Sequence, residues 1–269
     1  MMAPDAGVAV RYEVAGGVAT LTMDQPHNRN ALTPALINGL GDGLAAANAD
    51  PGVRVVVLTN AGPAFCAGAD LSGGAGSGAG DSPRFRLADI LASMQDSPKP
   101  IVGRIAGHCL GGGVGLAAAC DLSIAAADTR FGFTEVRLGV APAIISVVCL
   151  PKLRRSDALE LFLTGERISA GRASEVGLIT AAVPADGLDA AVGELVAKLV
   201  SGGPAALAAT KRLVFEVPAL PRDEGFDQTT AISEALFASA EAAEGMAAFR
   251  EKRSPAWAPP AAGADKATS

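Results

Sequence analysis

The chain has 269 residues, of which 49% are hydrophobic and 19% charged, a balance typical of a globular protein with one large domain or one domain and an appendage. Aromatic residues make up only 4%, so Ala, Val, Leu and Gly must fill the core. The net charge of −6 disfavours a nucleic acid or an anionic membrane as partner, and any anionic ligand must be held by local basic groups.

The 4 cysteines and 2 histidines form no C-x-x-C motif and no cluster typical of a metal site, so we expect reduced thiols and no bound metal. Residues 1–9 lack the basic and apolar regions of a secretory signal. The longest uncharged stretch, 105–120, is shorter than the ~20 apolar residues that span a bilayer, and glycines interrupt it. We therefore expect a soluble, cytoplasmic protein without a membrane partner.

The first 60 residues predict two paired strands, a helix and a buried strand. Strands are expected at 8–12 and 18–23, joined by a glycine turn. Thr33 is expected to cap an amphipathic helix that ends near residue 48. The Val-rich run at 54–60 predicts a strand buried on both faces.

Strands and helices continue to alternate in the middle of the chain. The Gly- and Ser-rich stretch 72–82 predicts a mobile loop that borders the ligand site. The remaining elements are expected as helices at 83–94, from about Gly112, at 156–164 and at 170–176, and as strands at 101–105, 122–125 and 179–183.

From residue 188 the apolar spacing is helical only. We predict a core at 1–187, a helical C-terminal region at 188–253 and a disordered tail at 254–269 rich in Pro, Ala and Gly.

Two glycine-bearing segments and one carboxylate suggest a site for a thioester oxygen. The segments 65–70 and 108–113 each follow an apolar, strand-like run and combine small residues with backbone N–H groups. Glu135 follows the second segment among apolar neighbours, which should raise its pKa toward the range of a general acid or base. Such chemistry needs neither a metal nor a nucleophile.

Each of these residues also has a purely structural interpretation. The glycines at 111–113 could serve close helix–strand packing, Glu135 could lie on the surface, and Asp70 could cap a turn. His108 and Cys109 are strand neighbours that point to opposite faces, which argues against a Cys–His dyad and favours a buried, hydrogen-bonded His108.

Five motifs in one order resemble the enoyl-CoA hydratase/isomerase (crotonase) family. They are FCAGADL at 65–71, the glycines at 111–113, CDL at 120–122, FGFTEVRLG at 131–139 and AAFREKR at 247–253. The resemblance covers residues 8–257. It implies an α/β fold (α+β in some schemes): a spiral of ββα units with a C-terminal helical region that builds homotrimers, often paired into hexamers.

The resemblance also implies roles for individual residues. Ala69 and Gly112 match the family's two oxyanion-hole donors, both acting through backbone N–H, and Glu135 matches a catalytic acid/base glutamate. The stretch that lines the acyl-CoA substrate corresponds to Ala67, Asp70, Leu71 and Ser72. The implied activity belongs to acyl-CoA, or fatty acid, metabolism and needs no cofactor beyond the coenzyme A of the substrate.

One position departs from the hydratases of the family. Their second catalytic glutamate lies two residues after the glycine run, where this chain has Gly115. A single carboxylate can move a proton between carbons two atoms apart, as in the family's 3,2-enoyl-CoA isomerases, which also lack this glutamate. A hydratase that uses another polar group, Ser146 or Asp89, and a CoA-binding protein with impaired catalysis remain alternatives.

The phosphates of CoA require basic partners. Arg29 is the first candidate, followed by Lys211, Arg84 and Arg86, although each could be a solvated surface charge, and for Lys211 that interpretation is favoured.

Other functional classes fit less well. A scaffold protein on the same fold stays open, with Glu135 as the discriminating residue. The chain has no G-x-S-x-G of a serine hydrolase, no early G-x-G-x-x-G of a dinucleotide enzyme and no phosphate-binding G-x-x-x-x-G-K-[ST].

Overall fold

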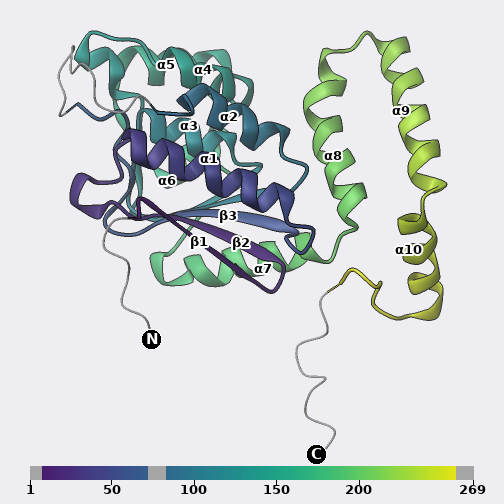
Figure 1. Cartoon of the computed structure of the whole chain (residues 1–269). Helices are drawn as coiled ribbons and strands as arrows, with labels where there is room; N and C mark the ends of the chain where they lie inside the picture. The colour runs from purple at the N-terminus through teal and green to yellow at the C-terminus, as the bar shows by residue number, and fades with distance from the viewer. Residues whose placement is uncertain (1–7, 72–82, 259–269) are drawn as a thin grey trace, which may run out of the picture.

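A twisted, mostly parallel sheet forms the centre of the computed structural model, which describes residues 8–71 and 83–258 (Figure 1). Within these residues the strands follow the order β1 (Val10–Ala15), β2 (Val18–Met23), β3 (Val55–Asn60), β5 (Ile101–Ile105), β7 (Leu122–Ala126) and β10 (Ala181–Val183). Only the β1–β2 pair is antiparallel there. The predicted hairpin is confirmed, although β1 begins two residues later and ends three residues later than predicted.

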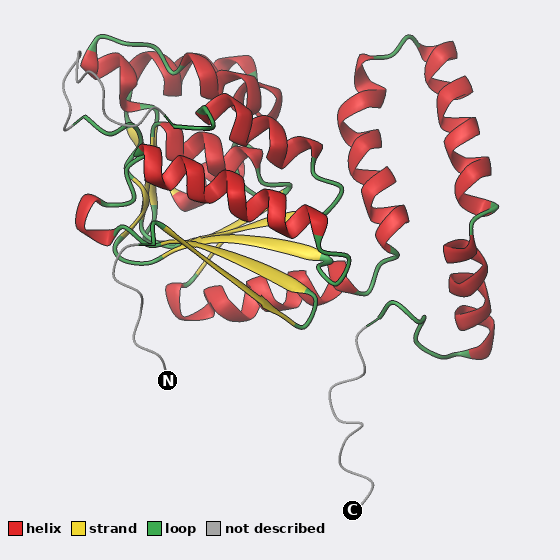
Figure 2. Cartoon of the chain, in the orientation of Figure 1, coloured by secondary structure: helices red, strands yellow, loops and turns green. Residues whose placement is uncertain are grey.

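Strand β3 shows why this sheet has helices on both faces. Every one of its residues is buried, and successive side chains point to opposite sides. Val56 and Leu58 pack in the larger core cluster, whereas Val55 and Val57 pack in a second cluster. The sheet is therefore a middle layer, as Figure 2 shows.

The larger cluster includes buried residues from all the helices on one side of the sheet. These helices are α1 (Pro34–Ala49), α2 (Leu87–Asp96), α3 (Gly112–Ala119), α4 (Ala143–Cys149), α5 (Arg155–Thr164) and α6 (Ala170–Glu175). Helix α7 (Leu188–Val200) covers the other face. Thr33 caps α1 as predicted, because its Oγ accepts a hydrogen bond from Leu36 N at 3.2 Å. The helix predicted at 83–94 begins later, at Leu87, and α4 was not predicted.

A second sheet, which the sequence pattern did not predict as a unit, consists of very short strands. In the described residues its order is β4 (Ala64–Cys66), β6 (His108–Leu110), β8 (Arg130–Gly132) and β9 (Arg167–Ser169). The β4–β6 and β6–β8 pairs are parallel. The carboxyl ends of β4, β6 and β8 therefore meet at one edge, which brings the segments after them together.

The last three helices, α8 (Pro204–Glu216), α9 (Arg222–Phe237) and α10 (Ala240–Glu251), stand beside the layered part in Figure 1. We call them the C-terminal arm. The Arg54 guanidinium, directly before β3, holds the chain on both sides of the arm, because it donates to Gly202 O at 2.5 Å before α8 and to Trp257 O at 2.8 Å after α10. The boundary between core and helical region predicted at residue 187 stays a prediction. The predicted loop 72–82 and residues 259–269 of the predicted tail lie outside the described residues.

No single helix among the described residues is long and apolar enough to cross a membrane, although the bent pair Ala185–Val200 and Pro204–Ala219 passes by length and composition alone.

Candidate active site

The segment after β4 is held by backbone hydrogen bonds to the turn before α1. Ala67 N donates to Arg29 O at 3.0 Å, and Leu32 N donates to Gly68 O at 2.8 Å. Gly68 has φ +90°, a conformation that favours glycine. These bonds fix Ala69 at the edge of the sheet, where it is exposed.

The turn itself is fixed by the buried side chain of Asn30. Its Nδ2 donates to Ala61 O at 3.0 Å and to Ala64 O at 2.8 Å, and its Oδ1 accepts from Gln25 N at 2.7 Å. Asn30 therefore connects the turn to both ends of the loop 61–64, which leads into β4.

The segment after β6 turns sharply into α3. Gly111 has φ +52°, and its N–H donates to Gly132 O at 2.9 Å. The N–H groups of Gly112 and Gly113 lie in the first turn of α3, where they have no acceptor within the helix. Among the described residues, no backbone carbonyl accepts a hydrogen bond from Ala69 N or Gly112 N.

The two segments and Glu135 lie in direct contact. A methyl group built on Gly68 would lie 3.6 Å from Gly112 N, and one built on Gly111 would lie 3.1 Å from Glu135 Oε1. The structure thus brings together the three elements that the sequence analysis selected. An oxygen near the start of α3 would meet N–H donors and the positive end of the helix dipole.

Glu135 lies in the 3₁₀ helix η2 (Thr134–Leu138), directly after β8. Burial raises the pKa of its carboxyl above the usual value, as the sequence predicted. Its Oε2 is buried and has no hydrogen-bond partner among the described residues. An unpaired, partly desolvated carboxyl of this kind can both accept and return a proton.

The space at Gly115 is already filled. A methyl group built there would lie 2.4 Å from Cγ2 and 2.9 Å from Cβ of Ile145 in α4, and 3.6 Å from Cδ1 of Leu91 in α2. The surroundings of this position are therefore hydrocarbon.

The two polar groups considered as replacements for a second acid are engaged elsewhere. Asp89 Oδ2 accepts a hydrogen bond from Arg86 N at 2.8 Å, and the hydrogen bonds from Arg86 lower the pKa of Asp89 to about 2. Such a carboxyl is ionised and is a poor proton donor. Ser146 Oγ donates to Ala143 O at 2.6 Å within α4.

The basic candidates for CoA phosphates separate into two groups. Arg29, Arg84 and Arg86 are exposed, but Arg84 pairs with Asp42 and Arg86 with Asp89. The preferred interpretation of Lys211 as a surface charge is wrong: this lysine is buried, and its Nζ lies 3.0 Å from Asp121 Oδ2. A buried, paired ammonium joins α8 to the sheet and is not available to a phosphate.

The expectation for His108 is also wrong in part. Cys109 is buried and His108 points to the opposite face, as strand alternation requires, but that face is exposed.

All four cysteines lie within the described residues and are free and buried. No group of three or more His, Cys, Asp or Glu residues in the described ranges could hold a metal ion.

An open cavity adjoins the site. It has a volume of about 670 Å³ and is lined by Leu71, Thr134, Arg137, Leu138, Gly165, Glu166 and Arg167. Leu71 continues the Ala69 segment, and Thr134 precedes Glu135, so the cavity lies along the expected path of a substrate. Asp70, which precedes Leu71, is exposed, and Ser72 lies outside the described residues.

The geometry of this site agrees with comparisons of the whole chain. A family model described as enoyl-CoA hydratase/isomerase matches residues 13–260. The chain belongs to this family. It is an enzyme of the lyase and isomerase type, with the crotonase fold.

Several individual relatives of the enoyl-CoA hydratase/isomerase family align over nearly the full length. The chain is 32% identical to the (E)-benzylidenesuccinyl-CoA hydratase of Thauera aromatica, covering 92% of this chain and 98% of the relative. It is 32% identical to the 2,3-dehydroadipyl-CoA hydratase of Escherichia coli, covering 88% and 94%. A crystal structure of enoyl-CoA hydratase from Bacillus anthracis superimposes with a TM-score of 0.85 at 32% identity, covering 93% and 99%.

Ile145 and Leu32 also border this site, although neither was predicted from the sequence. A methyl group on Gly112 would lie 2.3 Å from Leu32 Cδ1, so Leu32 packs over the first turn of α3. Both side chains belong to apolar runs that resemble ordinary core, and no local sequence signal separates them from it.

Proposed function

We propose that this enzyme isomerises 3-enoyl-CoA thioesters to 2-enoyl-CoA with Glu135 as its single proton carrier. Backbone N–H groups of Ala69 and Gly112 would donate to the thioester oxygen as negative charge develops on it. Glu135 would take a proton from C2 and return it to C4, while the double bond moves from C3–C4 to C2–C3. The proton and the electron pair are thus conserved.

One observation carries this proposal. The Glu135 carboxylate lies against Gly111, at the start of α3, while the place of a second acid at Gly115 is occupied by Ile145. Adding water to a double bond in one step is easier with two groups that hold and exchange protons, whereas moving one proton needs only one.

A second candidate is hydration of 2-enoyl-CoA. The names of the relatives favour it, since the T. aromatica and E. coli proteins are both called hydratases. A CoA-binding protein with impaired catalysis is a third candidate, supported only by the absent second acid.

Parallel assays with 3-enoyl-CoA and with 2-enoyl-CoA in water separate these candidates. We expect isomerisation to exceed hydration in the wild-type enzyme, and Glu135→Gln to lower isomerisation about 10²–10⁴-fold, because the amide cannot take a proton. Binding of a saturated acyl-CoA, measured by calorimetry, serves as the control and should persist. If the wild-type enzyme hydrates 2-enoyl-CoA faster than it isomerises 3-enoyl-CoA, the hydratase is favoured. If the wild type and Glu135→Gln isomerise at equal rates, Glu135 does not take part in catalysis.

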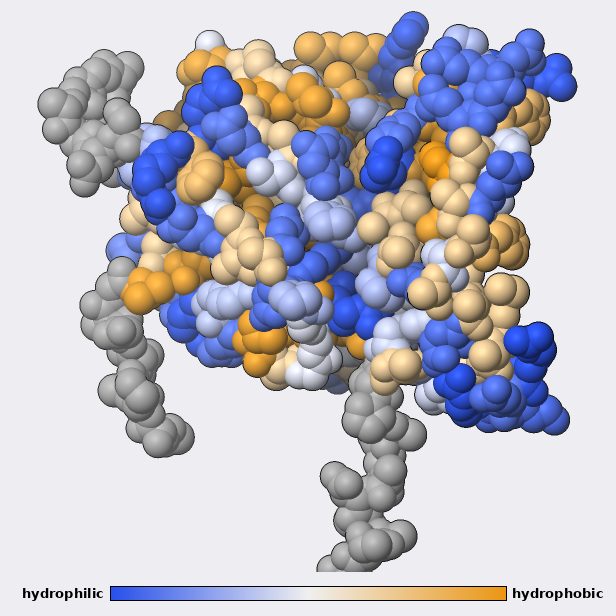
Figure 3. Space-filling view, turned by 45° about the vertical axis from the view of Figure 1, so that its right-hand side comes forward, coloured by the Kyte–Doolittle hydropathy of each residue, from blue (hydrophilic) through white to orange (hydrophobic). Residues whose placement is uncertain are grey.

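We also propose that the enzyme assembles as a homotrimer or a dimer of trimers. Large apolar side chains of the C-terminal arm lie in solvent, with Phe226 62%, Phe237 70% and Phe249 86% exposed. The surface view in Figure 3 shows hydrophobic patches among the hydrophilic ones. Exposed apolar area on this scale supports a protein partner, and a second copy of the chain is the partner that the family resemblance suggests.

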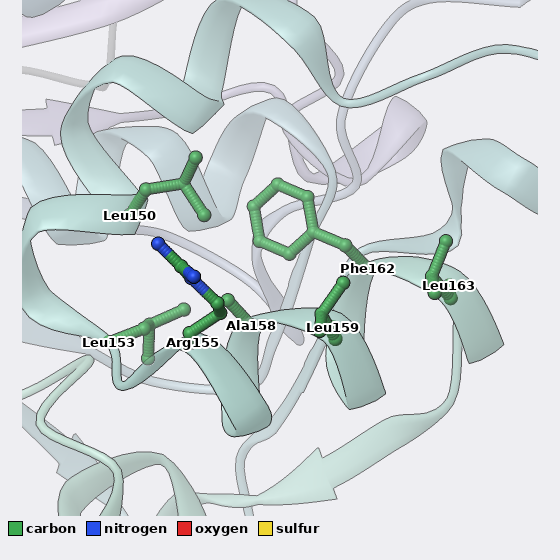
Figure 4. A pocket seen from close by; sticks show the side chains of 7 residues that line it. All are labelled: Leu150, Leu153, Arg155, Ala158, Leu159, Phe162 and Leu163. Carbon is green, nitrogen blue, oxygen red and sulfur yellow. The ribbon is translucent and has the colours of Figure 1, made fainter.

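An apolar groove on the layered part supports the same proposal. It has a volume of about 500 Å³ and lies between the end of α4 and α5. Figure 4 shows its lining residues, which are Leu150, Leu153, Arg155, Ala158, Leu159, Phe162 and Leu163. The aromatic side chains of another copy's arm have the chemistry to fill it.

A further inference from the structure

The first turn of α3 is bordered by the proposed catalytic carboxylate and by a bulky hydrocarbon side chain. Gly111 is the N-cap residue of α3, and Gly115 lies one turn further along, inside the helix. The space in front of Gly111 holds Glu135 Oε1, and the space in front of Gly115 holds Ile145.

Ile145 is held firmly in that place. It is 2% exposed and belongs to the main core cluster, so its position is fixed by packing on all sides. Cys149, one turn further along α4, also lies near the carboxylate: burial raises the pKa of this thiol to about 12, and the charge of Glu135 adds to the rise. The same face of α4 therefore borders both Gly115 and Glu135.

We propose that Ile145 is the residue that determines the reaction of this site, because it fills the volume that a carboxylate at position 115 would need. This proposal rests on the proposed single-carboxylate function and deepens it. In hydration the water oxygen bonds to C3, one water proton passes to a carboxylate, and a carboxylate delivers a proton to C2. Ile145 leaves no room there for the second carboxylate of this exchange.

The steric part is tested by a double-mutant cycle read by urea unfolding. Gly115→Ala should lower the urea midpoint, because its Cβ would lie 2.4 Å from Ile145 Cγ2. In the Ile145→Ala background the same change should lower the midpoint by less than half as much, since only the contact with Cβ remains. Equal falls in both backgrounds would overturn the proposal.

The chemical part is tested by giving the site a second acid and room for it. Gly115→Glu combined with Ile145→Ala should hydrate 2-enoyl-CoA at least tenfold faster than Ile145→Ala alone. The matched control is Gly115→Gln combined with Ile145→Ala, which has the same shape without an acid and should show no gain. No gain in the first double variant, with circular dichroism showing it folded, would overturn the proposal.

The two tests fail separately from the proposed function. A wild-type enzyme that does not isomerise 3-enoyl-CoA would contradict the proposed function, whatever the unfolding cycle shows. Ile145 would still be established as the residue that excludes the second acid if two results hold. Gly115→Ala must lower the urea midpoint less in the Ile145→Ala background than in the wild type, and Gly115→Glu combined with Ile145→Ala must gain hydration.

Discussion

At the scale of single residues, the site combines strong backbone donors with one poorly solvated acid. In the proposed mechanism Gly112 supplies its backbone N–H and Glu135 its carboxyl, and neither role requires another side chain. This makes the two contributions separable by substitution.

The donor at Gly112 is tested by comparing Gly112→Pro with Gly112→Ala. Both variants place a carbon near Leu32 Cδ1, which is the end of a flexible side chain and can shift. Only proline removes the N–H, and the first turn of a helix tolerates it. We expect kcat to fall about 10²–10³-fold more in the proline variant. Similar kcat values for the two variants would show that the N–H is not a donor.

The acid is tested by pH. Because burial raises the pKa of Glu135, its proton-accepting carboxylate forms only as the pH rises through that raised value. We expect kcat/KM for isomerisation to fall on the acid side, with a midpoint above the ordinary glutamate value of 4.5. Profiles of kcat/KM between about pH 4 and 8 measure this, and a midpoint at or below 4.5 would contradict the burial argument.

At the scale of elements, three-residue strands do most of the positioning. The edge formed by β4, β6 and β8 aligns three chain segments that lie far apart in sequence. A separate contact fixes the first arm helix, since Lys211 Nζ donates to Met94 O at 2.7 Å besides pairing with Asp121.

Lys211→Ala tests how strongly α8 is joined to the sheet. Removing the ammonium leaves Asp121 largely buried without its cation, which should cost about 3–5 kcal/mol in the free energy of unfolding. Urea unfolding measures the loss, and Lys198→Ala, at an exposed lysine of α7, is the control. A loss below about 1 kcal/mol would place the pair among weak surface bridges.

At the scale of the whole molecule, the arm exposes large apolar side chains, and an apolar groove lies beside α4 and α5. Assembly would cover this surface.

Phe249→Glu tests the assembly. Phe249 is 86% exposed, so a charge there should not disturb the isolated chain, whereas it would be buried in an interface. Sedimentation velocity should show a shift from trimer or hexamer to smaller species. Phe249→Leu, which keeps an apolar side chain, should assemble as the wild type does. An unchanged distribution for the glutamate variant would exclude this residue from the interface.

Sequence by itself determined the larger elements and the candidates for the site. Periodicity and capping residues act locally, so α1 with Thr33, the buried strand β3 and the start of α3 at Gly112 were predicted from their own neighbourhoods. The raised pKa of Glu135 was also predicted from its apolar sequence neighbours, but the burial that causes it involves segments far away in the sequence, such as the one at Gly111.

Tertiary structure alone decided what fills the space between elements. Strands of three residues are too short to show a period, so the second sheet exists only through pairing of distant segments. The burial of Lys211 and the exposure of His108 depend on which element covers them. Ile145 meets Gly115 only because α3 and α4 pack together, and a contact between residues thirty positions apart leaves no local pattern in the sequence.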